Sequence, residues 1–212
     1  MSNFGSVLKN WRQMQRFGGF LHLNNQDRRQ DETGQSTPDL WAELVEKCRK
    51  GDGKAQKKLF DLLSPKMFAV CLRYMGSRDA AEDVLQDGFV TLFSKLDSYA
   101  GDGSFEGWSR KVFINTALME LRRKDALKMG VGLEEVSGMA GGGATQMQNI
   151  GYKELMKLVM SLPAGYRTVF NMAVIEGYSH NEIAQELGIS EATSRSQLQR
   201  ARKILQEKIR NM

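Results

Sequence analysis

Residues 177–203, GYSHNEIAQELGISEATSRSQLQRARK, decide the fold of the C-terminal part of this 212-residue chain. Ser179 followed three residues later by Glu182 is a capping box, which predicts the start of a helix. Gly188 can adopt the positive φ of a tight turn, and Ser190 can cap a second helix. Two short helices joined by a turn that contains glycine predict a helix-turn-helix.

The second predicted helix has an inward face and a polar, basic outward face. Ser194, Leu198, Ala201 and Leu205 follow one another at steps of four, three and four residues, the spacing of a buried helical stripe. A basic outward face favours recognition of DNA, although an ordinary solvated helix shows the same pattern. The residues left outside the stripe are Arg195, Ser196, Gln199, Arg200, Arg202 and Lys203.

Composition and charge indicate a helical protein with a mild basic excess. Of its residues 41% are hydrophobic, only three are proline, and the formal net charge is +5. From Tyr152 onward nine Lys and Arg oppose six Asp and Glu, a net charge of +3, whereas residues 37–125 carry fifteen against fourteen. The basic excess therefore lies toward the helix-turn-helix, as neutralisation of DNA phosphates requires.

Cysteine and histidine are too few and too scattered to predict catalysis or metal binding. Cys48 and Cys71 lie in separate apolar helical patterns without a CxxC partner, which predicts core residues, and His22 and His180 are the only histidines. We therefore expect no metal site, no cofactor and no enzymatic activity. The N-terminus lacks the apolar core of a signal peptide, and no apolar run approaches the roughly 20 residues that span a bilayer. These features predict a cytoplasmic protein without membrane insertion.

The distribution of helical patterns predicts an all-α fold of two small helical domains joined by a flexible linker. Glycine is concentrated between the domains, where residues 130–151 contain seven glycines and no helical period. The predicted parts are a polar, largely mobile extension at 1–36, a helical domain at 37–125, the linker at 126–151 and the helix-turn-helix domain at 152–212.

Four helices are predicted within residues 37–125. The first begins at Thr37-Pro38 and ends near Gly51, and Pro65 is expected to kink the second. The second, third and fourth are predicted at 55–74, 78–96 and 105–124. The residues expected to be buried are Ala81, Val84, Leu85, Phe89, Leu92 and Leu96 in the third helix, and Phe105, Trp108, Val112 and Leu121 in the fourth.

Two separate segments resemble one family. Residues 79–124 resemble the second domain of the extracytoplasmic-function (ECF) RNA polymerase sigma factors, with an acidic helix start, an Asp-x-x-Gln-Asp step, an aromatic loop, a Phe-x-x-Trp pair and a terminal Arg-Arg. Residues 161–205 resemble the fourth domain of that family, including Leu-Pro before its first helix. The resemblance implies a protein that binds core RNA polymerase and directs promoter-specific initiation by recognising −10 and −35 elements.

By this resemblance, three surfaces carry the function. Asp83, Gln86 and Asp87 share one helix face and would bind core RNA polymerase. The −10 element would be held as single-stranded DNA by a loop and the helix after it, with basic residues on the phosphates. The −10 residues are Tyr99, Gly101, Asp102, Ser104, Arg110, Lys111, Asn115, Met119, Arg122 and Arg123, joined by Lys124 for phosphate contact. The residues for duplex DNA at the −35 element are Glu191, Thr193, Arg195, Ser196, Gln199, Arg200 and Lys203.

Some positions depart from the family pattern, and a second interpretation stays open. Ser194 and Gln197 stand where the family usually has valine and arginine, and Asp87 stands where glutamate is usual. An anti-sigma protein is a further candidate partner. The alternative is an autonomous helix-turn-helix regulator with an N-terminal domain for dimerisation or ligand binding, which would bind duplex DNA tightly without polymerase.

Overall fold

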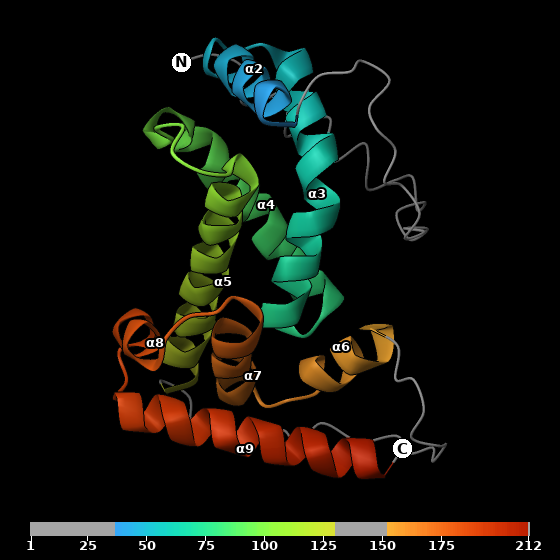
Figure 1. Cartoon of the computed structure of the whole chain (residues 1–212), viewed down its shortest axis with the longest axis vertical. Coiled ribbons are helices and arrows are strands. Elements are labelled where there is room, and N and C mark those ends of the chain that lie inside the picture. The colour runs from blue at the N-terminus through green and yellow to red at the C-terminus, as the bar shows by residue number, and fades with distance from the viewer. Residues whose placement is uncertain (1–36, 130–151, 212) are drawn as a thin grey trace. The chain divides into compact units, whose positions relative to one another are not determined.

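The computed structural model describes residues 37–129 and 152–211, and every regular element in these ranges is helical (Figure 1). The predicted all-α fold is therefore confirmed. The sequence-based expectations for residues 1–36 and 130–151 lie outside the described residues. The elements are α2 (Thr37–Arg49), α3 (Gly53–Met75), α4 (Arg78–Ser94), η1 (Leu96–Ser98), α5 (Phe105–Met129), α6 (Tyr152–Met160), α7 (Ala164–Phe170), η2 (Asn171–Ile175), α8 (His180–Leu187) and α9 (Glu191–Arg210).

The described residues form two compact units, of which the first contains residues 37–65 and 92–109. It comprises α2, the first half of α3, the end of α4, η1 and the start of α5. Asp52 begins α3, because its Oδ1 accepts hydrogen bonds from the backbone N–H of Lys54 (2.8 Å) and Ala55 (3.2 Å). The buried side chains of this unit include Leu44, Val45, Cys48, Ala55, Leu59, Leu63, Leu92, Leu96 and Phe105.

The second unit contains residues 66–91, 110–129 and 152–211. Within it α4 and α5 approach closely at Gly88, where an added Cβ would lie 2.3 Å from Cδ1 of Phe113. Phe113 also meets Phe89 edge-on, with ring centroids 5.0 Å apart. The stripe predicted for α4 is confirmed, since Ala81, Val84, Leu85, Phe89, Leu92 and Leu96 are all buried, although Leu96 belongs to η1.

The buried face predicted for α5 is mostly wrong. Of the four residues expected inside, only Phe105 is buried, and Trp108, Val112 and Leu121 are half-buried. The face differs from the prediction because it includes a serine and an alanine, which the spacing of large apolar residues does not mark. Among residues 105–124 of α5, the buried ones are Phe105, Ser109, Phe113, Ile114, Ala117 and Leu118.

Two helix boundaries also differ from those predicted. The helix expected over 55–74 spans Gly53–Met75, with Pro65, the residue at which a kink is expected, in its interior. The carbonyl that loses its N–H partner to this proline belongs to Asp61, which is exposed and can be hydrated. Helix α5 continues to Met129 rather than ending near Lys124, because Ala, Leu, Lys and Met at positions 126–129 are good helix formers.

A buried arginine joins α7 to the ends of α6 and α3 inside the second unit. The Arg167 guanidinium donates to the carbonyls of Met160 (3.0 Å), Leu162 (2.9 Å), Tyr74 (3.1 Å) and Met75 (3.1 Å). These carbonyls lie at or just beyond helix C-termini, where they lack intrahelical partners. Burial lowers the pKa of Arg167, and the charge is compensated by carbonyl dipoles.

Next to it, η2 contacts the same end of α3. Asn171 Nδ2 donates to the Arg73 carbonyl at 2.9 Å, and Arg73 Nη2 lies 2.7 Å from Glu176 Oε1. The side chains of that ion pair are only 9% and 5% exposed. Such a buried pair positions its partners strongly, because separating them would leave a charge without compensation.

The two cysteines are core residues, as predicted. Cys48 and Cys71 are buried free thiols, and burial raises their pKa to about 11 and about 12. In the part of the chain that the structure describes, no cluster of His, Cys, Asp and Glu has the makings of a metal site. None of the helices in residues 37–129 and 152–211 has the length and apolarity to cross a bilayer.

Candidate functional site

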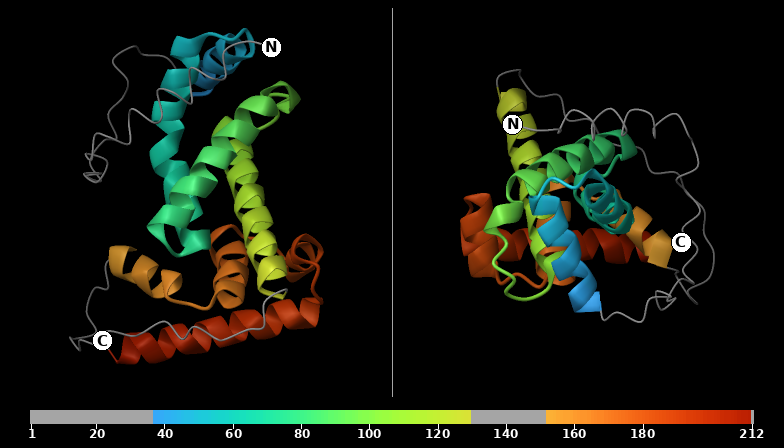
Figure 2. Two further views of the ribbon diagram at one scale, coloured as in Figure 1. Left: turned by 180° about the vertical axis from the view of Figure 1, so that it is seen from behind. Right: turned by 90° about the horizontal axis from the view of Figure 1, so that it is seen from above.

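The helix-turn-helix predicted from residues 177–203 is present as α8 and α9. Ser179 Oγ accepts from the Glu182 N–H at 3.2 Å, and Glu182 Oε2 accepts from the Ser179 N–H at 2.8 Å, so the capping box is complete. Gly188 ends α8 with φ of 66°, and Ser190 Oγ caps α9 by accepting from the Thr193 N–H at 3.0 Å. Both views of Figure 2 show α8 beside the N-terminal end of α9.

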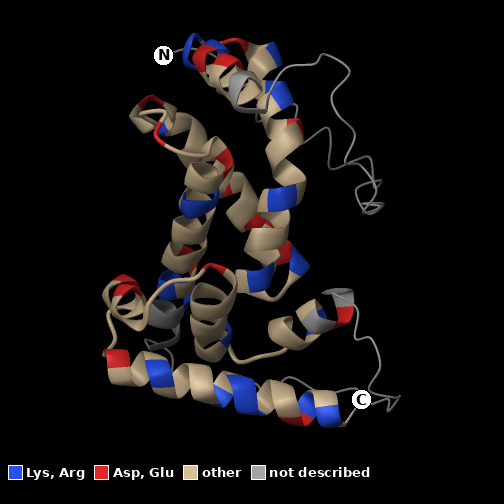
Figure 3. Cartoon of the chain, in the orientation of Figure 1, with Lys and Arg blue, Asp and Glu red and all other residues tan. Residues whose placement is uncertain are grey.

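The inward face of α9 is the predicted one. Ser194, Leu198, Ala201 and Leu205 are buried, and the last two pack in a cluster with residues of the α6–α7 segment. The opposite face consequently points outward, and Figure 3 shows Lys and Arg spaced along α9. The residues of α9 predicted for the −35 element that are exposed are Arg195, Ser196, Gln199, Arg200 and Lys203.

Side-chain contacts at the start of α9 hold the outward face in order. Arg195 forms an ion pair with Glu191 one turn earlier, and Asn181 Nδ2 of α8 donates to Glu191 Oε1 at 3.1 Å. Gln185 Nε2 in turn donates to Asn181 Oδ1 at 3.0 Å. Four polar side chains from the two helices thus form one chain of contacts that ends at Arg195.

Two hydroxyls on this face bond to their own helix terminus. Thr193 Oγ1 lies 2.8 Å from Ser190 Oγ, and Ser196 Oγ donates to the Thr193 carbonyl at 2.9 Å. Farther along the helix, Arg200 Nη1 donates to Tyr166 Oη at 3.3 Å. Arg195 and Arg200 are therefore oriented before any ligand is present, whereas the hydroxyls of Thr193 and Ser196 have partners near the start of α9 itself.

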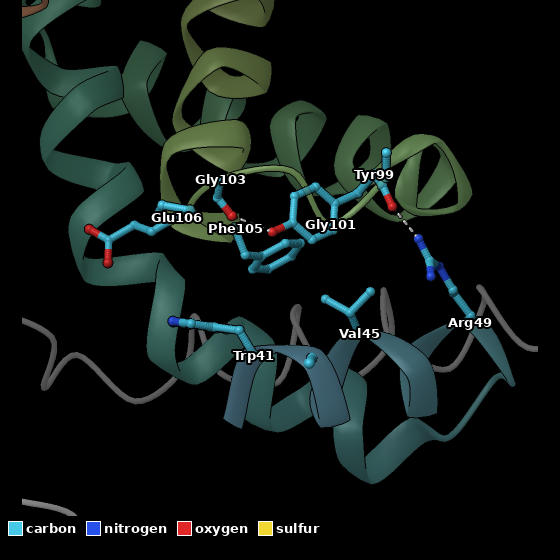
Figure 4. A pocket seen from close by; sticks show the side chains of 11 residues that line it. Trp41, Val45, Arg49, Tyr99, Gly101, Gly103, Phe105 and Glu106 are labelled. Atoms are coloured by element: carbon cyan, nitrogen blue, oxygen red, sulfur yellow. Dashed lines mark hydrogen bonds between the residues drawn. The ribbon is translucent and has the colours of Figure 1, made fainter. Parts of the chain in front are cut away.

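A cavity of about 690 Å³ lies in the first unit between α2 and the loop before α5. Figure 4 shows Trp41, Val45 and Arg49 of α2 on one side and Tyr99, Gly101 and Gly103 of the loop on the other, with Phe105 between them. The cavity has an aromatic wall, because Phe105 lies 5.4 Å from Trp41 and 5.1 Å from Tyr99 between ring centroids. A volume of this size falls within the range of small-molecule sites.

Hydrogen bonds fix the shape of this loop. Arg49 Nη2 donates to the carbonyls of Leu96 (3.1 Å) and Tyr99 (2.5 Å), and Tyr99 Oη donates to the Gly103 carbonyl at 2.8 Å. Gly101 has φ of 89° and no atom close to where a Cβ would lie, so the loop backbone is open to a ligand there. The remaining predicted loop residues, Asp102 and Ser104, are exposed.

Sequence reasoning missed Trp41 and Arg49. Both lie on α2, about fifty residues before the loop, and no local pattern relates the two segments. The expectation that Phe105 belongs to the core is confirmed by its exposed fraction of 2%. Trp108 is half-buried and stacks on Phe105 with the ring centroids 5.7 Å apart.

The predicted −10 residues of α5 lie in the second unit. Lys111, Asn115 and Met119 are exposed at steps of four residues and so share one helix face, and Met119 is 66% exposed. Arg123 is held by Glu120 through hydrogen bonds of 2.7 and 2.9 Å, and this contact raises the pKa of Arg123. Arg122 is also exposed, and Lys124 lies 3.4 Å from Glu120.

Arg110 does not share that face. Its Nη1 lies 3.5 Å from Glu176 Oε2, on the carboxylate that also pairs with Arg73. The structure thus brings together Lys111, Asn115 and Met119 and gives Arg110 a separate, intramolecular partner.

The three residues predicted for polymerase binding lie on α4. Asp83 and Asp87 are exposed, and Gln86 between them is half-buried. Partial burial raises the pKa of Asp87, with smaller contributions from the carboxylates of Glu120 and Asp83. Val90 is 37% exposed on the next turn, so an apolar side chain extends this acidic surface.

Comparison with known proteins identifies the family. The model of sigma-70 region 2 matches residues 59–126, and that of sigma-70 region 4 matches residues 152–205. The chain is 30% identical over 177 residues to the ECF RNA polymerase sigma-E factor of Escherichia coli K12, which covers 78% of this chain and 92% of that protein. The chain belongs to the ECF RNA polymerase sigma factor family. It is thus an RNA polymerase sigma factor, and the predicted resemblance is confirmed.

Two further relatives are more distant. The ECF RNA polymerase sigma factor SigW of Bacillus subtilis is 26% identical over 179 residues, covering 79% of this chain and 96% of SigW. Among solved structures, the sigma factor RpoE of Bartonella quintana, crystallised with the anti-sigma factor NepR, is 22% identical. It covers 73% of this chain and 96% of its own, with a TM-score of 0.48.

Proposed function

We propose that this sigma factor recognises the −35 element with the outward face of α9. We propose that it recognises the −10 element with the loop at residues 99–104 and with the exposed face of α5 that carries Lys111, Asn115 and Met119. The observation that carries the proposal is the helix-turn-helix, whose second helix buries one stripe and leaves a continuous polar, basic face. The B-form major groove admits one α-helix, and side chains of the arginine and glutamine type recognise base edges there.

Within α9, the division of labour follows from the contacts. Arg195 and Gln199 lie one turn apart on the exposed face, and we assign them to base edges. Each bidentate contact of this kind contributes about 1–3 kcal/mol of discrimination. Arg200 and Lys203 are assigned to phosphates.

For the −10 element, the cavity beside Gly101 is assigned to one unstacked base of single-stranded DNA. An extruded base requires a pocket with an aromatic or apolar wall and polar groups at its edge. The wall is supplied by Trp41 and Phe105, and the polar edge by Ser104 and Arg49, while Asp102 is exposed on the same loop. Lys111, Asn115 and Met119 follow in the sequence and are assigned to the next nucleotides.

We assign the binding of core polymerase to the α4 surface formed by Asp83, Gln86 and Asp87. Side chains at i, i+3 and i+4 lie side by side on a helix, so one basic partner element can contact all three. Replacing Asp83 and Gln86 with alanine should weaken association with core polymerase without loss of helicity. Unchanged association in a pull-down would remove this assignment. We place the protein in the cytoplasm, where polymerase and promoters are found.

The decisive experiment is run-off transcription with core polymerase and a library of promoters. We expect transcripts that depend on both the chain and particular −10 and −35 sequences, and an Asp102→Ala chain that loses activity without a change in melting temperature. A chain that binds duplex DNA tightly by itself and gives no transcript with core polymerase would favour the autonomous regulator.

A further inference from the structure

Two adjacent polar residues at the start of α8 reach across to the first two turns of α9. His180 Nδ1 lies 2.8 Å from Ser194 Oγ, and its neighbour Asn181 donates to Glu191 at 3.1 Å. His180 is half-buried and Ser194 is completely buried. Helix α9 is therefore joined to α8 by one part-buried and one exposed hydrogen bond.

The Ser194 end of the first bond is buried on an otherwise apolar face of α9. Ser194 is the first member of the inward stripe that continues with Leu198, Ala201 and Leu205. A buried hydroxyl without a partner is unfavourable, so the Ser194 hydroxyl depends on the imidazole. Apolar contacts are non-directional, whereas a hydrogen bond weakens steeply when its angle changes. The pair of His180 and Ser194 thus restricts the rotation of α9 about its own axis.

Rotation of α9 determines where its outward side chains point. Arg195 follows Ser194 directly in the helix, and its guanidinium is paired with Glu191, which also accepts from Asn181. Both contacts from α8 therefore act on the turn that carries Arg195. A small rotation at Ser194 would move the guanidinium out of the plane of a base edge without unfolding either helix.

We propose that His180 is a positioning residue for promoter recognition, whose hydrogen bond to Ser194 sets the orientation in which α9 presents Arg195 to the −35 element. The proposal rests on the proposed function of α9. His180 itself contacts no base in this scheme, and its effect on DNA passes through Ser194.

The test separates hydrogen bonding from packing by two substitutions of His180. Asn retains an amide near the position of Nδ1, whereas Phe retains the ring volume without a hydrogen-bonding group. Four variants of the full chain are made: His180→Asn, His180→Phe, Ser194→Ala and the double variant with His180→Phe and Ser194→Ala. Each is assayed with core polymerase on a reference promoter and its single-base −35 variants. Glu186→Ala, an exposed change on the same helix, is the matched control, and thermal melting checks that each chain is folded.

The measured quantity is the ratio of transcript from the reference promoter to that from each variant. We expect His180→Asn and the control to stay within about twofold of the unsubstituted chain. His180→Phe and Ser194→Ala should lower the ratio at least fivefold, because an aimed base contact discriminates by about 5- to 150-fold. The double variant should be no worse than the worse single variant, since both changes remove the same bond.

Discrimination by His180→Phe equal to that of the unsubstituted chain would overturn the proposal and assign the ring to packing. Losses that add in the double variant would also overturn it. These results leave the proposed function intact, because the unsubstituted chain still discriminates between promoters. An unsubstituted chain without promoter-dependent transcripts would instead refute the proposed function, and the positioning role with it.

Discussion

Replacing Arg167 with methionine tests how the second unit is held together. The guanidinium donates four hydrogen bonds of 2.9–3.1 Å to carbonyls at the ends of α3 and α6. Methionine has similar length and no donor, so the substitution leaves all four carbonyls without this partner. The side chain is 8% exposed, and water cannot readily replace it.

The magnitude follows from the type of bond. Hydrogen bonds to a charged group contribute about 1.5–3 kcal/mol each, but the guanidinium also loses hydration, as the lowered pKa of Arg167 shows. The methionine side chain recovers some apolar burial. We therefore expect the free energy of unfolding to fall by about 3–5 kcal/mol, less than the sum of four bonds. For a chain of this length that corresponds to a melting temperature lower by roughly 6–20 °C.

The assay is thermal unfolding followed by circular dichroism at 222 nm. The matched control is Arg202→Met, which makes the same chemical change at an exposed position of α9. Arg167→Lys keeps the charge but offers one nitrogen, which cannot reach all four carbonyls, so it should recover only part of the loss. An Arg167→Met chain that melts within about 2 °C of the control would refute the reasoning.

Further predictions concern α4 and α9. Gly88→Ala places a Cβ 2.3 Å from Phe113 and should lower the free energy of unfolding by about 1–3 kcal/mol in a urea titration; unchanged stability would mean that α4 and α5 separate freely. The raised pKa of Asp87 means that its charged form opposes folding, so Asp87→Asn should melt higher than the unsubstituted chain at neutral pH. The melting temperatures of the two chains should converge at a pH that protonates the Asp87 carboxyl in both the folded and the unfolded state. A lower melting temperature of Asp87→Asn at neutral pH would contradict the raised pKa. Arg195→Ala should reduce transcription unevenly across −35 variants, whereas Lys203→Ala should weaken all of them equally and reduce the salt slope by about one; a common factor for both would make Arg195 a phosphate contact.

Much of the fold followed from local sequence signals. The capping box at Ser179, the turn at Gly188 and the cap at Ser190 were predicted and are present, because each depends on residues at most four positions apart. The stripe of α4 was also predicted, since regular spacing of large apolar residues marks a buried face. On α5 the same reasoning failed. Ser109 and Ala117 are completely buried there, and small residues contribute too little hydrophobicity to mark a buried face in the sequence.

The sequence by itself determined that the chain is helical, that it ends in a helix-turn-helix and which family it resembles. Only the tertiary structure decided which distant residues meet: Arg49 with the Tyr99 loop, Arg167 with the end of α3, and His180 with Ser194. The physical reason is the range of the interactions. Capping and helical periodicity act within a few residues, whereas the partner of a buried polar group is set by how separate helices pack. The sequence shows that Ser194 interrupts an apolar stripe, but only the packing of α8 against α9 supplies its hydrogen-bonding partner, His180.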